Sequence, residues 1–131
     1  MKFVLTRKGI LKMKSSRELD SIIHMLIFKN PFFSTFYADE SSPTGYSVAP
    51  TVPMYSTVDG DAFRIIRSFD RREWDIDIHS DTEDEGKIWS VSFMQYPNET
   101  EPEGLKAEGS CNDREFCVAV CKAAMLAIIK V

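Results

Sequence analysis

The fold is decided by the stretch WDIDIHSDTEDEGKIWSVSF, residues 74–93. Polar side chains alternate at both of its ends with apolar ones, which are Trp74, Ile76, Ile78, Trp89, Val91 and Phe93. A period of two is typical of a β-strand with one buried face. The acidic segment between the two halves predicts a turn, and a third, weaker strand is expected at about 105–108. We therefore predict a three-stranded antiparallel sheet, since nothing in the chain supplies the crossovers that parallel strands need.

Three amphipathic helices are predicted to pack with this sheet. They are expected at about 15–30, from 56 or 59 to 69, and from 112 to 128. Ser15 and Glu18 at the start of the first helix have the spacing of a capping box, and Asn112 and Glu115 stand in the same relation at the start of the last. The order α-α-β-β-β-α predicts the α+β class, with helices packed on a three-stranded antiparallel sheet.

The first 14 residues are expected to form a basic leader, as an extra strand or an arm, ahead of a single domain over 15–131. Residues 1–17 hold six basic residues and no acidic one, whereas the remainder holds 10 basic and 20 acidic residues, which together give a net charge of −4. An acidic body repels nucleic-acid phosphates and suits a basic protein surface as its partner. No apolar run reaches the ~20 residues that span a bilayer, and the start lacks a secretory signal. We therefore expect a cytoplasmic protein with no membrane association.

The segment 30–56 is irregular but rich in aromatic residues. It contains four prolines and one glycine, together with Phe32, Phe33, Phe36, Tyr37, Tyr46 and Tyr55. Since disordered linkers are poor in aromatics, we expect a loop that packs down, with a short strand near 46–49. The phenylalanines are expected to fill the core beneath this loop. The three tyrosines, Tyr37, Tyr46 and Tyr55, are candidates to line a pocket or an interface, because tyrosine suits surfaces that are half apolar and half wet.

A polar face of the sheet is the second candidate surface. If the register follows the alternation, one face carries Asp75, Asp77, His79, Ser90, Ser92, Lys106 and Glu108. This face is either open to solvent or covered in part by helix and loop. An uncovered polar face would be a candidate binding surface, and Asp75, Asp77 and His79 are its most distinctive residues.

The residue types that carry common chemistries do not gather in the sequence. Cys111, Cys117 and Cys121 are an odd set and predict free thiols, since the two histidines lie far away and zinc needs four ligands. Asp75, Asp77 and His79 could hold Mg²⁺ as in a nuclease, but the chain offers no second carboxylate cluster. No nucleophile elbow, P-loop or dinucleotide motif is present. We predict no catalytic residue, no metal and no cofactor, with a metal-dependent nuclease as the alternative.

Three segments resemble one family. Met54-Tyr55-Ser56-Thr57 followed by Ala62 and Ile66, the helix RELDSIIHML from Arg17, and AVCKAAMLAI at 119–128 are similar to stretches of the phage ABA-sandwich domain family, small proteins of phages and prophages. The resemblance covers roughly 17–129. It implies an α-β-α sandwich and supplies no catalytic residue. The basic leader, the long aromatic segment and the late aspartate at Asp59 depart from the family pattern.

The leading functional hypothesis is a non-enzymatic phage or prophage accessory protein in the cytoplasm of its bacterial host. The family resemblance favours binding to a host protein through the acidic body, for instance to inhibit a defence system. The alternative is an oligomer that sequesters a nucleotide signal between tyrosines and backbone amides. A third is a virion or replication accessory protein. Nucleic acid is an unexpected partner, because the start of the last helix, 112–115, is close to neutral where a double-stranded-RNA-binding domain carries lysines.

Overall fold

The computed structural model describes residues 5–95 and 107–129. In chain order the elements are α1 (Arg7–Lys12), α2 (Arg17–Leu26), α3 (Phe32–Thr35), β1 (Phe36–Ala38), β2 (Tyr46–Val48), α4 (Asp59–Arg71), β3 (Asp75–Glu83), β4 (Gly86–Gln95), β5 (Ala107–Asp113) and α5 (Phe116–Ile128). The predicted α+β class and the three-stranded antiparallel sheet are confirmed. The structure adds the short helices α1 and α3 and the strand β1, which pairs with β2 in a hairpin.

The three-stranded sheet has the strand order β3-β4-β5, and its register follows the alternation of the sequence. Ile76 lies opposite Phe93 and Ile78 lies opposite Val91, so the apolar side chains share one face. Cys111 of β5 continues this face beside Val91. β5 lies later than the strand expected at 105–108, of which only 107 and 108 fall among the described residues. Its sequence, AEGSCND, is poor in strand-forming residues, so pairing with β4 rather than local preference places it.

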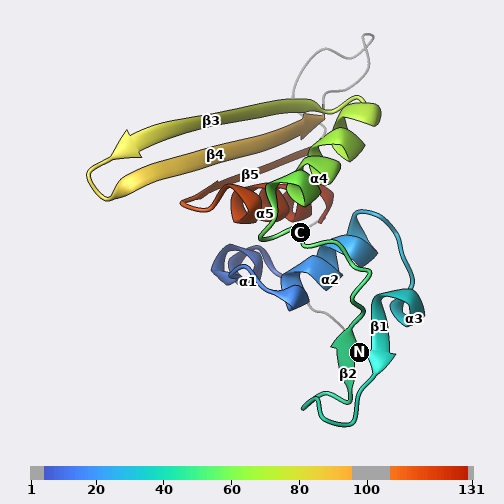
Figure 1. Cartoon of the computed structure of the whole chain (residues 1–131). Helices are drawn as coiled ribbons and strands as arrows, with labels where there is room; N and C mark the ends of the chain where they lie inside the picture. Colours follow the sequence, from blue (N-terminus) through green and yellow to red (C-terminus); the bar gives the residue numbers. More distant parts are fainter. Residues whose placement is uncertain (1–4, 96–106, 130–131) are drawn as a thin grey trace.

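Helix α5 forms the centre of the molecule, between the sheet and the helix pair α1 and α2 (Figure 1). All residues from 117 to 127 are buried, because β4 and β5 cover one side of the helix while α1 and α2 cover the other. A helix that is apolar on every side is typical of such a central position. The approach of β5 to α5 is closest at Gly109, where a Cβ would overlap the backbone at Ala123 and Ala127.

The described helices cover one face of the three-stranded sheet. α4 lies beside α5 on the face that carries Phe93, whose ring centroid is 4.3 Å from that of Phe69 in α4. On the opposite face Asp75, Asp77 and His79 are exposed. Among the described residues the layers therefore run from the sheet to α4 with α5, and then to α1 with α2 (Figure 1). This differs from the α-β-α order of layers that the family resemblance implied, because the apolar α5, not the sheet, forms the middle layer.

The leader contains a helix rather than the extra strand or the arm considered from the sequence. Helix α1 begins after Thr6, whose side-chain oxygen accepts a hydrogen bond from the Gly9 amide. Ile10 is fully buried in the core. The Leu11 carbonyl accepts a hydrogen bond of 2.9 Å from the buried ammonium of Lys122 in α5. Burial of one side chain and satisfaction of one buried charge together hold this helix against the domain.

Two predicted helix starts are wrong in detail. Ser16, not Ser15, caps α2, since its side-chain oxygen accepts from the Leu19 amide at 3.1 Å. The last helix begins at Phe116 with Glu115 as its cap residue, whereas Asn112 lies in β5. Strand pairing with β4 takes up Asn112 and displaces the helix start by about one turn.

The aromatic segment divides into two parts. The β1–β2 hairpin lies at the end of the molecule away from the three-stranded sheet (Figure 1), whereas Val52 and Tyr55 are buried in the main core. The strand predicted near 46–49 is confirmed as β2. The Phe32 ring packs on Phe36 and on the edge of Tyr46. Phe33 is 83% exposed, so the expectation that it fills the core is wrong. Phe33 lies in the short helix α3, and its side chain is on the solvent-exposed side of that helix.

Candidate functional site

A cavity of about 590 Å³ lies between the C-terminal end of α2 and helix α4. Four arginines line it, Arg64, Arg67, Arg71 and Arg72, and no acidic side chain of the described residues does so. The chain as a whole carries 20 acidic and 16 basic residues, so this cavity concentrates positive charge in a protein of net negative charge. We call it the arginine pocket.

The row of arginines follows from the amphipathic pattern of α4. Ala62, Ile65 and Phe69 are buried on the side that faces the core. Arg64, Arg67 and Arg71 follow at intervals of three and four residues on an exposed side, which places them in one row along the helix. The row therefore depends only on the sequence of α4 and on which side of that helix is buried.

The four arginines are not equivalent. Arg72 donates a hydrogen bond of 2.9 Å to the Ile27 carbonyl and so ties α4 to the end of α2. Arg71 lies in the last turn, where the helix dipole favours a cation. Arg64 and Arg67 lie before that turn, and neither makes a hydrogen bond or ion pair with the residues that the structure describes. Helix stability therefore explains Arg71 and Arg72 but leaves Arg64 and Arg67 without a structural role.

The wall opposite the arginines consists of His24, Phe28, Asn30 and Tyr55. Tyr55 is only 2% exposed and its ring stacks on Phe28 with a centroid distance of 5.2 Å. Burial raises the pKa of Tyr55 to about 12, so its hydroxyl is protonated at neutral pH. This wall therefore contains two stacked aromatic rings and one protonated hydroxyl group.

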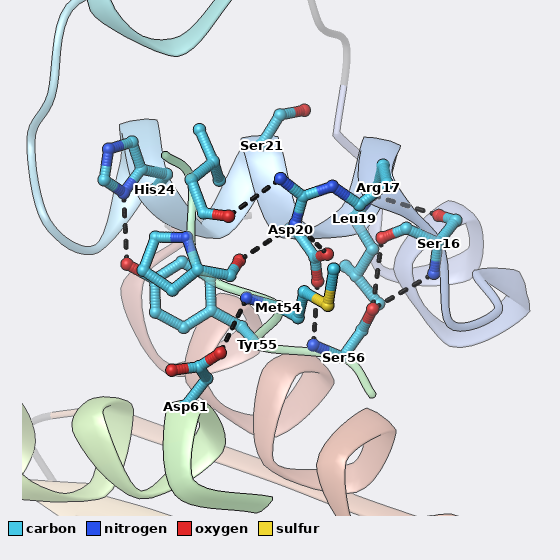
Figure 2. Close-up of polar contacts among 12 residues, drawn as sticks. Ser16, Arg17, Leu19, Asp20, Ser21, His24, Met54, Tyr55, Ser56 and Asp61 are labelled. Atoms are coloured by element: carbon cyan, nitrogen blue, oxygen red, sulfur yellow. Dashed lines mark hydrogen bonds and ion pairs between the residues drawn. The ribbon is translucent and has the colours of Figure 1, made fainter. Parts of the chain in front are cut away.

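His24 contributes a hydrogen-bond donor to this wall. The Tyr55 hydroxyl lies 3.0 Å from Nδ1 of His24 and the Asn30 amide nitrogen lies 3.4 Å from the same atom (Figure 2 shows the tyrosine contact). The Asn30 amide nitrogen only donates and the Tyr55 hydroxyl is able to donate, so both contacts are satisfied when Nδ1 accepts and the proton of the neutral ring is on Nε2. Burial, and secondly the nearby charge of Arg64, lowers the pKa of His24, so the ring is neutral at pH 7. No described residue accepts a hydrogen bond from Nε2.

A buried polar network holds Tyr55 in place (Figure 2). Asp20 accepts 2.8 Å hydrogen bonds from the Arg17 guanidinium and from the Ser56 amide. The Ser56 hydroxyl in turn donates to the Ser16 carbonyl at 3.1 Å and accepts from the Ser16 amide at 3.0 Å. The residue next to Tyr55 is therefore fixed to the first turn of α2 by three hydrogen bonds.

The same network extends along the segment that precedes Tyr55. Arg17 also donates to the backbone carbonyls of Ala49, Val52 and Pro53. From the other side, Asp61 of α4 accepts a hydrogen bond of 2.9 Å from the Met54 amide. Helices α2 and α4 thus clamp this segment between them, which positions the aromatic wall against the arginine row.

The structure separates the three tyrosines predicted to form one surface. Tyr55 lies at the base of the arginine pocket. Tyr37 and Tyr46 lie on the β1–β2 hairpin, and the register pairs Tyr37 with Ser47 but Tyr46 with Ala38, so the two rings project from opposite faces. Both are about half exposed. Tyr37 and Tyr46 therefore belong to the surface of the β1–β2 hairpin and do not line the arginine pocket.

The structure brings Asp75, Asp77 and His79 together on the open face of the sheet. The imidazole Nδ1 of His79 lies 3.6 Å from an oxygen of Asp77, and both side chains are more than half exposed. Ser92 lies opposite Asp77 and bonds to Ser110 at 2.9 Å, which continues the polar face across all three strands. Lys106, predicted for the same face, lies outside the described residues. Within the described parts of the chain, no three metal-binding side chains form a group.

The three cysteines are unpaired, which confirms the expected free thiols. Cys117 donates a hydrogen bond of 3.1 Å to Asp59 at the start of α4. Burial, reinforced by this bond and by the aspartate charge, raises the pKa of Cys117 to about 12. Burial also raises the pKa values of Cys111 and Cys121. Thiols with raised pKa values are poor nucleophiles, so these side chains act as packing groups.

Sequence reasoning missed the arginine pocket. None of the arginines of the helix predicted to end at 69 was among the candidate site residues. The spacing of these arginines in an otherwise acidic chain was the available signal. His24, which was not a candidate site residue either, is partly buried and lines the pocket.

Comparisons with known proteins bear on the fold alone. No protein-family model and no curated protein matches the sequence. Among solved structures, the fold is similar to that of a phage protein from Bacillus cereus, with a TM-score of 0.62 and 16% sequence identity over 98% of this chain and 100% of that one. No helix among the described residues is long and apolar enough to cross a membrane. The chain therefore has a fold similar to that of a phage protein, at a low level of sequence identity.

Proposed function

We propose that this chain is a non-enzymatic binding protein of phage origin that holds a phosphate-bearing small molecule in the arginine pocket. The observation that carries the proposal is the lining of the cavity: four arginines and no described acidic side chain in a chain of net charge −4. Phage origin is supported by the shared architecture with the Bacillus cereus phage protein and by the family resemblance of the three segments.

The chemistry of the lining selects phosphate. Guanidinium groups match phosphate oxygens with paired donors, and such charge-assisted bonds are among the strongest hydrogen bonds in proteins. The volume of about 590 Å³ lies within the usual range for small-molecule pockets. The net negative charge of the chain repels large polyanions, whereas the arginine pocket attracts a small anion that fits inside it. Because a single chain builds the pocket, sequestration of a ligand does not require the oligomer of the alternative hypothesis.

Neutralising Arg64 and Arg67 should strongly weaken ligand binding without unfolding the protein. Wild type is expected to gain thermal stability with at least one member of a panel of AMP, ADP, ATP and cyclic di-GMP, because a ligand that binds only the folded state stabilises it. Arg64→Gln/Arg67→Gln should lower the affinity about 100-fold, since each charge-assisted hydrogen bond contributes about 1.5–3 kcal/mol. Differential scanning fluorimetry and titration calorimetry measure both effects.

Arg7→Gln is the matched control, because Arg7 is an exposed arginine of α1 that does not line the arginine pocket. It removes one positive charge and should leave the affinity within twofold of wild type. If no phosphate compound in the panel raises the melting temperature, the proposal is wrong.

A second candidate function is binding to a basic surface of a host protein, as an inhibitor of a defence system would. The open sheet face favours it, because Asp75, Asp77, Asp81 and Glu108 are exposed there with no described helix above them. Complementary charge at an interface raises association rates and selects partners.

Capture from host lysate separates the two candidates when paired variants are compared. A protein retained by wild type and by Arg64→Gln/Arg67→Gln, but lost with Asp75→Asn/Asp77→Asn, would assign the sheet face as its binding surface. Both aspartates are exposed, so these substitutions should leave the free energy of unfolding within about 0.5 kcal/mol of wild type. Equal capture by all three forms, or capture lost only with the arginine variant, would contradict the second candidate.

A further inference from the structure

We propose that the ligand of the arginine pocket carries a chain of at least two linked phosphates, as in a nucleoside diphosphate or triphosphate or in a short inorganic chain such as tripolyphosphate. This inference rests on the proposed function and narrows it to one chemical class. Its basis is the number of cations in the pocket, their arrangement in a row, and a neutral donor on the facing wall.

The charge of the pocket exceeds that of one phosphate. The four lining arginines are permanently protonated, and none has an acidic partner among the described residues that line the pocket. A single phosphate group brings a charge of only about −1.5 to −2 at pH 7. Three guanidinium groups drawn onto one such group would still repel one another. Linked phosphates supply the additional charge that three or four guanidinium groups can share.

The arrangement of the cations matches an extended anion. Arg64, Arg67 and Arg71 lie on one side of α4, and the first and last are separated by about 10 Å along the helix axis. Arg72 is bound to the Ile27 carbonyl, which holds its guanidinium near the end of this row. A chain of phosphates lying along α4 would contact successive arginines, whereas a single phosphate would engage only one part of the row.

The facing wall offers a donor that does not depend on protonation. His24 is neutral at pH 7, and Nε2–H remains unpaired among the described residues because Nδ1 accepts from Tyr55. His24 lines the same cavity as the arginines, and its Nε2–H is the donor available to a phosphate oxygen on the side away from α4. A phosphate chain in the pocket would then be held from two sides, by charge from α4 and by a neutral hydrogen bond from α2.

Titration calorimetry with the full chain tests the inference, in buffer without divalent cations. The probes are inorganic phosphate, pyrophosphate and tripolyphosphate, with adenosine, AMP, ADP and ATP as the nucleoside series. Affinity is expected to rise about 10-fold with each added phosphate in both series, because each contributes further charge-assisted bonds. Arg64→Gln and Arg71→Gln, at the two ends of the row, should each lower tripolyphosphate affinity about 10-fold, while Arg7→Gln should not.

The outcomes separate this inference from the proposed function. Tripolyphosphate and ATP of equal affinity would identify the phosphate chain itself as the recognised group, and a tighter ATP would add a contribution from the nucleoside; both support the inference. Phosphate or AMP binding within threefold of its triphosphate counterpart would overturn the inference and leave the proposed function standing. No binding by any phosphate compound would overturn both.

Discussion

Replacement of Gly109 by alanine should destabilise the protein by about 3 kcal/mol or more, which is a large part of the 5–15 kcal/mol typical of a domain. A Cβ on this residue would overlap the Ala123 carbonyl oxygen and the Ala127 amide nitrogen of α5. Both are backbone atoms of a helix buried on all sides, so neither can move without separating α5 from β5. The melting temperature should fall by roughly 10 °C or more, as followed by circular dichroism.

Gly60→Ala is the matched control for this substitution. Gly60 lies in the first turn of α4, and a Cβ there would meet no atom within 4 Å. Alanine is the better helix former, so this variant should keep or slightly raise the free energy of unfolding, by up to about 1 kcal/mol. Urea denaturation compares the two variants directly. Equal midpoints for Gly109→Ala and wild type would contradict the close packing of β5 on α5.

Replacement of Asp20 by alanine should cost about 3–5 kcal/mol, the range found when one partner of a buried ion pair is removed. Asp20 is 1% exposed, and its two oxygens accept from the Arg17 guanidinium and the Ser56 amide. Alanine would leave the Ser56 amide without its acceptor and would remove one of the hydrogen bonds of the Arg17 guanidinium, which keeps its backbone carbonyl acceptors. Ser56 would also lose one of its three hydrogen bonds to the start of α2. Phosphate ligands should then bind more weakly, because the neighbouring Tyr55 forms the floor of the arginine pocket.

Chemical denaturation of two further variants checks this prediction. Asp70→Ala removes an exposed carboxylate of α4 and should change the free energy of unfolding by less than about 0.5 kcal/mol. In a double-mutant cycle with Arg17→Ala, the combined loss should be smaller than the sum of the single losses by about 1–3 kcal/mol, because the two residues share one network. Strict additivity would show that the Arg17–Asp20 pair contributes little.

The open sheet face is an example of a surface that sequence reasoning located correctly. Alternation placed Asp75, Asp77 and His79 on one side of β3, and the register opposite Ser90 and Ser92 follows from the same period. A strand exposes every second residue to the same environment, so local sequence is enough to assign faces. The arginine row of α4 has the same origin, since a period of 3.6 places Arg64, Arg67 and Arg71 on one side of the helix.

Helix starts and the third strand were harder to predict, because the decisive contacts are distant in sequence. Ser15 and Ser16 have the same capping chemistry, and Ser16 has an additional partner in Ser56, which lies 40 residues away. Asn112 would cap a helix well, but pairing with Ser90 of β4 places it in a strand. The intrinsic conformational preferences of these residues do not separate the two caps, or cap from strand, because the alternatives have similar free energies without the distant contacts.

The sequence by itself determined the α+β class, the faces of the strands and the row of arginines on α4, because each depends on a short-range period. Only the tertiary structure decided that α5 lies at the centre, that Tyr55 is buried beneath a pocket and apart from Tyr37 and Tyr46, and that His24 faces the arginines. The physical reason is that these features arise from contacts between distant segments, such as Asp20 with Ser56 and Gly109 with Ala127. Such contacts depend on the fit of whole elements, which no local pattern encodes.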